Sequence, residues 1–223
     1  MSGLRTGKSV VREPAATSRR IFVGDVQGCA DALDRLLAAC QFDPKSDQLC
    51  LAGDLVRKGP DSKGVVDRAI ELDAKIVLGN HDLRWLQDRV DRPDARTRWL
   101  AAQPILRIWP DLAMVHAGMH PSWELDSLTE LEDAEVAFAV TVRTCDQTGR
   151  QPDVDWPPPG PPFAPWDVFW SGPRVVCGHW ARRGVQQTPS VVALDSGCCY
   201  GRSLTAWIAE EDRFVSVQSR GLL

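Results

Sequence analysis

Three stretches of the chain place a polar side chain that can bind a metal directly after an apolar run. Acidic residues end the stretches Ile21-Phe22-Val23-Gly24-Asp25 and Leu49-Cys50-Leu51-Ala52-Gly53-Asp54. An amide, an imidazole and a carboxylate stand side by side in Gly79-Asn80-His81-Asp82, which follows Lys75-Ile76-Val77-Leu78. In open α/β sheets, ligands bind outside the carboxyl ends of the strands. The three stretches therefore predict one shared site.

Two histidines extend this pattern. His116 ends the apolar run 113–115 and His179 follows the run 175–178, each beside a glycine. Taken singly, an Asp after Gly is most often a turn or cap residue, and such a His is most often a core residue. Taken together, carboxylate, imidazole and amide ligands suit Mn, Fe, Co or Zn better than Ca. Two such ions ~3.5–4 Å apart stabilise the attacking and leaving oxygens of a phosphoryl transfer.

The elements that must position these residues alternate between strand and helix in the first half of the chain. We expect strands over about 20–23, 47–53 and 75–79, and helices over about 31–40, 65–72, from Asp82 onward, and 94–102. Asp31 is the expected N-cap of the first helix. This order predicts an α/β fold with a parallel sheet and right-handed crossovers. Beyond Pro104, a more antiparallel half is expected, with a hairpin over 105–116, a helix over 129–142 and strands over 174–177, 191–194, 204–209 and 214–217.

The ends and the middle of the chain indicate how it is organised. Residues 1–19 contain several Arg and Lys but lack the apolar core of a secretory signal, so we expect a disordered basic arm. Residues 20–223 are expected to form a single domain. Within it, the segment 147–165 is rich in Pro and Gly and is expected to be an irregular loop or lid.

The composition narrows the classes of function. The chain has 223 residues, 43% of them hydrophobic and 25% charged, as in an ordinary soluble domain. A net charge of −4 argues against a nucleic-acid binder that works by bulk electrostatics. No apolar stretch approaches the ~20 residues of a membrane span. Seven cysteines without a CxxC pair favour reduced, buried thiols in a cytoplasmic protein; the oligomeric state is left open.

Five short blocks of the sequence resemble the signature of the metallophosphoesterases of the phosphoprotein-phosphatase type, which reads GDxHG, GDxxxRG, GNHD/E, HAG and GH. They occur in that order at residues 24–28, 53–59, 79–82, 116–118 and 178–179. A finer resemblance, to the symmetrical bis(5′-nucleosyl)-tetraphosphatase group, lies in Val26-Gln27-Gly28-Cys29 and in Ala193-Leu194-Asp195-Ser196-Gly197-Cys198-Cys199-Tyr200-Gly201. The resemblance covers about residues 21–209. It implies the calcineurin-like fold, in which mixed β-sheets are flanked by helices and the metal site lies at the C-terminal ends of strands.

The same resemblance implies a dinuclear centre of divalent transition metals, Mn or Co in the first place and Fe or Zn as alternatives. It assigns the ligands to six positions: Asp25 and Gln27 for one ion, Asp54 as the bridge, and Asn80, His116 and His179 for the other. A metal-bridging hydroxide would then attack an inner phosphorus of diadenosine tetraphosphate in line. The products would be two ADP.

The resemblance also implies roles for the residues around the metals. His81 would be the general acid that protonates the leaving oxygen, and Asp82 would support it. Lys58 and Arg143 are the candidates for binding the non-bridging phosphate oxygens.

The sequence departs from the wider family at three of these positions. Gln27 replaces the usual His, and its amide oxygen is a weaker ligand than imidazole. Lys58 stands where Arg is usual and lacks the bidentate fork. Arg57 stands where protein phosphatases carry the acid that orients the catalytic His, which argues against protein-phosphatase activity.

Two alternatives follow from these departures. The chain is shorter than typical tetraphosphatases between about 129 and 174, so a broader phosphatase acting on phosphoproteins or other phosphoesters is one alternative. A nucleotide-binding pseudoenzyme is the other. Trp123, Trp180 and Tyr200 could stack on adenine, although plain packing explains each of them as well.

Overall fold

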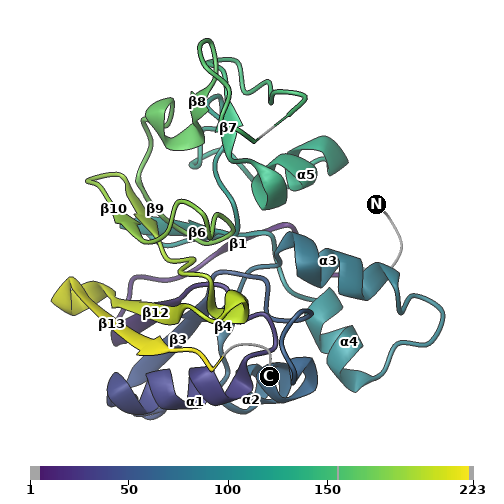
Figure 1. Cartoon of the computed structure of the whole chain (residues 1–223), viewed down its shortest axis with the longest axis vertical. Coiled ribbons are helices and arrows are strands. Elements are labelled where there is room, and N and C mark those ends of the chain that lie inside the picture. The colour runs from purple at the N-terminus through teal and green to yellow at the C-terminus, as the bar shows by residue number, and fades with distance from the viewer. Residues whose placement is uncertain (1–5, 155, 221–223) are drawn as a thin grey trace.

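Two β-sheets packed face to face form the centre of the molecule, with helices below and beside them in Figure 1. The computed structural model describes residues 6–154 and 156–220. The five-stranded sheet has the order β13-β12-β2-β3-β4 and consists of β2 (Arg19–Val23), β3 (Asp47–Leu51), β4 (Lys75–Ile76), β12 (Ser203–Ile208) and β13 (Arg213–Gln218). The six-stranded sheet has the order β1-β5-β6-β9-β11-β10 and consists of β1 (Val10–Arg12), β5 (Leu106–Ile108), β6 (Leu112–Val115), β9 (Arg174–Cys177), β10 (Gln186–Gln187) and β11 (Val191–Ala193).

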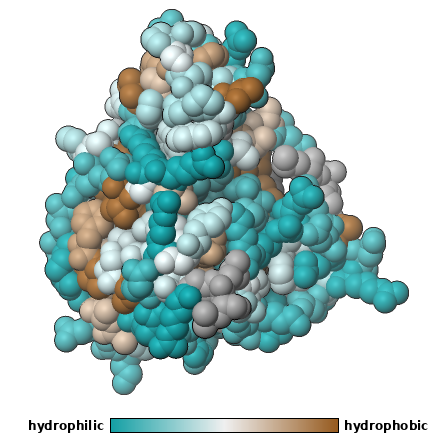
Figure 2. All heavy atoms as spheres, viewed as in Figure 1, coloured by the Kyte–Doolittle hydropathy of each residue, from teal (hydrophilic) through white to brown (hydrophobic). Residues whose placement is uncertain are grey.

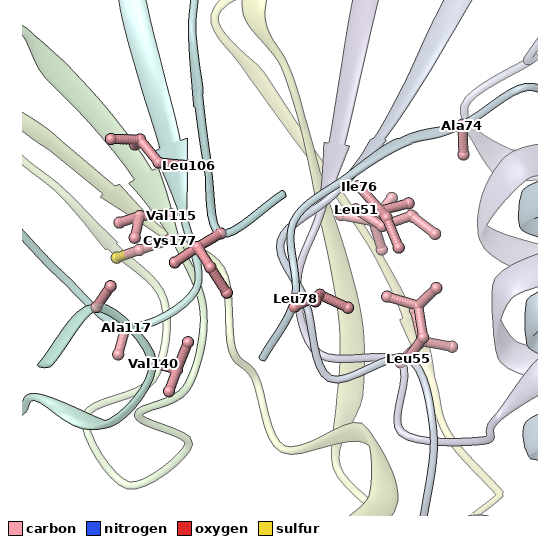
Figure 3. Close-up of a cluster of buried hydrophobic side chains, with 14 of the residues drawn as sticks. Leu51, Leu55, Ala74, Ile76, Leu78, Leu106, Val115, Ala117, Val140 and Cys177 are labelled. Carbon is pink, nitrogen blue, oxygen red and sulfur yellow. The ribbon is translucent and has the colours of Figure 1, made fainter. Parts of the chain in front are cut away.

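Alternating side chains along the strands explain why the sheets stack. Phe22 of β2 faces the other sheet, whereas its neighbours Ile21 and Val23 belong to the cluster on the opposite face. Met114 of β6 likewise faces inward, and Val115 outward. Successive side chains of a strand point to opposite faces, so strands that are apolar throughout bury both faces. Figure 3 shows part of the hydrophobic cluster that contains Ile21, Val23 and Val115, with Leu51 beside one sheet and Val115 beside the other.

The parallel pairing predicted for the first half and the hairpin predicted for the second are confirmed, but β9 of the second half pairs in parallel with both β6 and β11. β2, β3 and β4 pair in parallel, and β5 and β6 form the antiparallel hairpin. The helices are α1 (Ala30–Ala39), α2 (Ser62–Glu71), α3 (Asn80–Gln87), α4 (Ala95–Ala101) and α5 (Asp133–Thr141). α1 lies against β12 and β13 and covers the outer face of the five-stranded sheet (Figure 1).

Two predicted helix starts are wrong. Asp31 is not the N-cap of α1: Cys29 holds that position and makes no capping bond with its side chain. α3 begins at Asn80, two residues before the expected start at Asp82. The carboxylate of Asp82 instead accepts the backbone N–H of the N-cap residue, Gly79, at the helix N-terminus.

The upper part of Figure 1 contains α5 and a small two-stranded sheet, β7 (Thr144–Cys145) and β8 (Ala164–Pro165). Most of the Pro-rich segment 147–165 forms the irregular connection between these two strands, as the composition indicates. The face of the molecule in Figure 2 is mostly hydrophilic, with scattered hydrophobic residues. Among the described residues, every helix falls short of the length and apolarity that a membrane span requires.

The expectation of a disordered arm over residues 1–19 is wrong for the part that the structure describes. β1 (Val10–Arg12) is an edge strand that pairs in parallel with β5, and the side chain of Val10 is buried. Ser9 is fully buried, and its hydroxyl accepts the backbone N–H of Leu131 at 2.6 Å. Among the basic residues of this segment, Ser9 and Val10 are buried, Val11 is half-buried and Arg12 is exposed. The first five residues lie outside the described part of the chain.

Val10→Asp is expected to lower the free energy of unfolding by about 3–5 kcal/mol, because it buries a charge without a partner. Urea unfolding followed by circular dichroism measures this change. Val11→Asp is the matched control: Val11 is half-buried on the opposite face of β1, so a clearly smaller loss is expected. Equal, negligible effects of both substitutions would show that the segment does not pack on the sheet in solution.

Candidate active site

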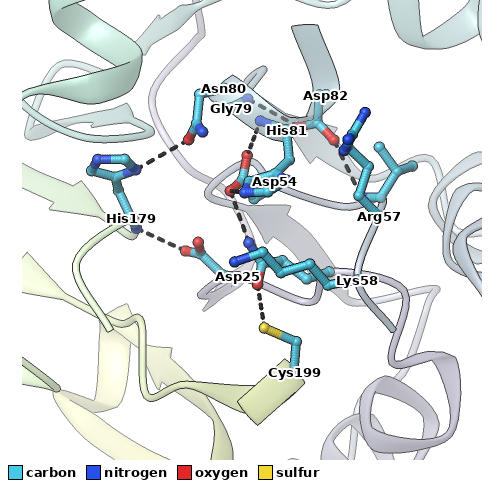
Figure 4. A network of polar contacts seen from close by, with 12 residues as sticks. Asp25, Asp54, Arg57, Lys58, Gly79, Asn80, His81, Asp82, His179 and Cys199 are labelled. Atoms are coloured by element: carbon cyan, nitrogen blue, oxygen red, sulfur yellow. Dashed lines mark hydrogen bonds and ion pairs between the residues drawn. The ribbon is translucent and has the colours of Figure 1, made fainter. Parts of the chain in front are cut away.

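The carboxyl ends of strands from both sheets meet at one place. Asp25 and Asp54 follow β2 and β3 of one sheet, whereas His116 and His179 follow β6 and β9 of the other. Asn80 begins α3 just beyond β4. Figure 4 shows Asp25, Asp54, Asn80 and His179 converging from these separate elements. The structure thus brings together the predicted ligands that lie far apart in the sequence.

Asp54 lies at the centre of this group and is almost fully buried. Its Oδ1 accepts the backbone N–H of His81 at 2.8 Å and lies 3.5 Å from His116 Nε2. Asp25, Asp54 and His116 each offer an atom within 4.8 Å of the others, which is close enough for all three to hold one metal ion.

Glycines allow the loops to close on these carboxylates. A Cβ at Gly79 would lie 2.2 Å from Asp54 Oδ1, and one at Gly178 would lie 2.1 Å from Asp25 Oδ1. Both distances are shorter than any real contact, so no other residue fits without displacing a candidate ligand. This explains the glycine before Asn80 and the one before His179.

The two histidines are oriented by backbone carbonyls. His116 Nδ1 lies 2.8 Å from Ala52 O, and His179 Nε2 lies 3.0 Å from Thr141 O. A carbonyl oxygen can only accept, so each ring donates its N–H there and leaves its other nitrogen with a lone pair. Burial, and next the neighbouring His116, lowers the pKa of His179 well below its ordinary value, so this ring is neutral. A neutral ring fixed by a carbonyl is the usual form of a metal-binding histidine.

The free nitrogens of both rings point at one oxygen. Asn80 Oδ1 lies 3.2 Å from His116 Nε2 and 3.1 Å from His179 Nδ1. Three groups that present lone pairs to one another repel unless a cation lies among them. The residues present therefore fit a divalent ion with nitrogen and oxygen ligands.

A group of buried carboxyl groups leads to the same conclusion. Asp25, Asp54, Asp82 and Asp195 are all buried. Burial, followed by the charges of Asp195 and Asp54, raises the pKa of Asp25 well above its ordinary value. Burial also raises the pKa of Asp195. Bound cations would offset this repulsion and keep the carboxylates ionised.

Gln27, which the sequence predicts as a metal ligand, lies beside Asp54 and lines the smaller of two cavities at this site. Its Nε2 donates to Asp54 Oδ2 at 3.0 Å, and its Oε1 accepts the thiol of Cys199. The amide oxygen is thus turned away from the carboxylates and occupied by the thiol. In this arrangement Gln27 orients Asp54 through its N–H group, and ligation of a metal by its oxygen stays a prediction.

Asp82 does not lie against the imidazole that it was expected to support. Its Oδ1 accepts the backbone N–H groups of Leu55 and Val56, at 2.9 and 3.3 Å, and its Oδ2 accepts that of Gly79 at 2.9 Å. Burial, and then the charge of Asp54, raises the pKa of Asp82 to about 8, while these N–H groups act in the opposite direction. The prediction that Asp82 supports His81 is wrong, because the carboxylate of Asp82 instead joins the loop after β3 to the backbone at the start of α3.

His81 is half-buried beside Asp54, with its Nε2 4.0 Å from Asp54 Oδ2. Burial lowers the pKa of His81, whereas the charge of Asp54 raises it. Lys58 is exposed and its ammonium group contacts the hydroxyl of Tyr200. Arg57, which occupies the position of the missing acid, instead pairs with Asp88 at 2.7 Å.

Two adjoining cavities open at this site. The smaller, of about 60 Å³, is lined by residues that the sequence assigns to the site, including Asp54, Lys58, His81 and Arg143. The larger, of about 570 Å³, is lined by Trp180 and Tyr200 among others. Trp123 takes no part, because it is buried and donates its indole N–H to Glu135 at 3.0 Å.

The sequence reasoning missed Asp195 as a site residue. It follows the apolar stretch Val191–Ala193 and Leu194 and lines the smaller cavity. The same pattern of an apolar strand followed by an acid identified Asp25 and Asp54, so it could also have identified Asp195.

A two-sheet sandwich whose strand ends carry this set of donors defines a class of metal-dependent phosphoesterases. The chain belongs to the calcineurin-like phosphoesterase family, whose model matches residues 18–190. It is 32% identical to the symmetrical bis(5′-nucleosyl)-tetraphosphatase of Shewanella oneidensis, over 87% of this chain and 96% of the relative. It is 33% identical to the protein of the same name from Edwardsiella ictaluri, over 90% of this chain and 96% of the relative.

Solved structures show the same relationship. The crystal structure of a putative diadenosine tetraphosphatase matches with a TM-score of 0.83 and 35% identity, over 95% of this chain and 98% of that one. A cold-active protein-tyrosine phosphatase from a Shewanella species matches with a TM-score of 0.62 at 16% identity, so it shares the fold alone. The alignment with the S. oneidensis relative runs over 265 positions, more than this chain contains, so that relative has segments that are absent here.

Proposed function

We propose that this chain hydrolyses diadenosine tetraphosphate symmetrically, giving two ADP, and that it uses two divalent transition-metal ions, Mn or Co. The relatives named symmetrical bis(5′-nucleosyl)-tetraphosphatase support the substrate. The observation that carries the proposal is the convergence of lone pairs from Asn80, His116 and His179 beside the buried carboxylates Asp25 and Asp54.

In this proposal, Asp25 and Asp54 hold one ion, and Asp54 with the Asn80, His116 and His179 group holds the other. Bound there, divalent ions activate water and neutralise charge on the reacting phosphoryl group. Gln27 holds the Asp54 carboxylate in place through its N–H group.

His81 is proposed as the general acid that gives its proton to the oxygen of the departing ADP. Burial lowers its pKa in the free protein, but the negative charges of a bound tetraphosphate act in the opposite direction and favour the imidazolium. Lys58 and Arg143 both line the smaller cavity and are proposed to bind non-bridging oxygens. Lys58 is oriented by Tyr200, whose ring centre lies 4.5 Å from its ammonium nitrogen.

The test is to incubate the purified chain with diadenosine tetraphosphate and Mn or Co and to separate the products by anion exchange. ADP as the sole nucleotide product is expected. AMP together with ATP would contradict symmetrical cleavage. Faster turnover of a phosphopeptide than of the dinucleotide would favour the broader phosphatase instead.

The seven cysteines are all free and buried, which supports a proposed location in the cytoplasm, where thiols stay reduced.

A further inference from the structure

The larger cavity at the site shares a wall with the smaller one. Arg143, His179, Ala181 and Tyr200 line both, so a ligand that reaches the candidate metal centre can extend into a space of about 570 Å³. That volume is typical of pockets for small organic ligands. We propose that this cavity binds one nucleoside of the substrate and that Trp156 is its principal stacking surface. The link to hydrolysis rests on the proposed function; the binding of a nucleotide does not.

Two aromatic side chains of the cavity are more exposed than their size would lead one to expect. Trp156 is 55% exposed and Tyr200 is 60% exposed, although most large apolar side chains of this chain are buried. Each ring lies against a cation: the guanidinium of Arg182 is 4.5 Å from the centre of the Trp156 ring, and Lys58 is equally far from that of Tyr200. These contacts orient the rings without burying them. Aromatic rings displayed in this way stack on nucleobases.

The charge of the cavity selects a particular kind of aromatic ligand. Arg143, Arg182 and Arg202 contribute to its lining, and among the described residues no carboxylate does. Guanidinium groups pair with phosphate oxygens through charge-assisted hydrogen bonds. A nucleotide carries both of the groups that this lining would bind, a flat base and phosphates. Its phosphates would lead toward the smaller cavity through Arg143, which lines both.

Trp156 belongs to the Pro-rich connection between β7 and β8. No sequence motif assigns this tryptophan to the site. Its successors Pro157, Pro158 and Pro159 restrict the backbone, so the ring is presented at a smaller cost in conformational entropy than on a flexible loop. The stacking surface is thus supplied by the segment that the sequence predicts to be an irregular loop.

The test compares the binding of ADP, measured by calorimetry, to the wild-type chain and to Trp156→Ala. We expect the dissociation constant for ADP to rise about tenfold in Trp156→Ala, within the range for removing one base–aromatic stack. Inorganic tripolyphosphate, which has no base, should bind both proteins within twofold. Val154→Ala is the matched control: Val154 is 64% exposed on the same segment and does not line the cavity, so its affinity for ADP should equal that of the wild type.

Equal ADP affinities of the wild type and Trp156→Ala would overturn the proposal, as would the absence of ADP binding to the wild type. Parallel loss of ADP and tripolyphosphate would also overturn it, because it would mark damage to the fold and not loss of stacking; Trp156→Phe, which keeps an aromatic face, should retain most of the affinity. Preferential, Trp156-dependent binding of a phosphotyrosine peptide would assign the cavity to another ligand. Trp156-dependent ADP binding without hydrolysis of diadenosine tetraphosphate would uphold the pocket and overturn only the proposed function.

Discussion

Replacing His81 with asparagine is expected to lower the turnover of diadenosine tetraphosphate by roughly 10²–10⁴-fold, the range for losing a general acid. Asparagine keeps the backbone N–H that donates to Asp54 Oδ1 at 2.8 Å, so the carboxylate should stay in place. The measurement is kcat at saturating substrate and Mn, together with the metal content of the purified variant. The metal content should equal that of the wild type.

The pH dependence provides a second readout for His81. The imidazolium is the active form of a general acid, so kcat of the wild type should fall as pH rises through the pKa of His81 in the complex, and this fall should be absent from the variant. His120→Asn is the control: His120 bonds to Ser122 within its own loop and should give wild-type activity. A His81→Asn variant that has lost its metal along with its activity would identify His81 as a ligand instead of an acid.

Asp54→Asn is expected to weaken metal binding by at least about 100-fold, because even the outer partners of metal ligands are worth 10–100-fold in affinity. Wild-type protein with Mn at about 100 times its dissociation constant should gain roughly 2.7 kcal/mol, a rise in Tm of about 5–10 °C. At the same Mn concentration, Asp54→Asn should show almost none of this rise and no measurable hydrolysis. Asp88→Asn removes an exposed carboxylate that pairs with Arg57 outside the site and should preserve the full rise.

The metal-free proteins should behave in the opposite way. Without ions, Asp54 faces Asp25 and Asp82 in a buried cluster, so neutralising it should leave the stability of the metal-free chain unchanged or raise it. A metal-free Asp54→Asn that unfolds at a much lower temperature would show that Asp54 serves the fold and not a metal. If Mn fails to raise the Tm of the wild type, the pseudoenzyme alternative is favoured.

Much of the fold could be predicted from the sequence because its signals are local. An apolar run such as Ile21-Phe22-Val23 favours a strand regardless of which strand it pairs with. The glycine and the acidic residue that follow it end the strand, at the same edge of the sheet as its parallel neighbours. The order of strands and helices then gives a parallel sheet. β1 was missed because its buried strand has only three residues and stands among basic ones, and pairing with β5 defines it.

The sequence alone determined which side chains could ligate metals and in what order they occur along the chain. Only the tertiary structure decided what each of them faces. The orientation of Gln27 depends on Cys199, which is 172 positions away, and Asp82 is occupied by backbone groups of the loop after β3. Trp156 belongs to the site only because its segment lies beside Arg182. The physical reason is that strand and turn propensities act between neighbours in the chain, whereas the partners of a polar side chain are set by how the two sheets and their loops pack.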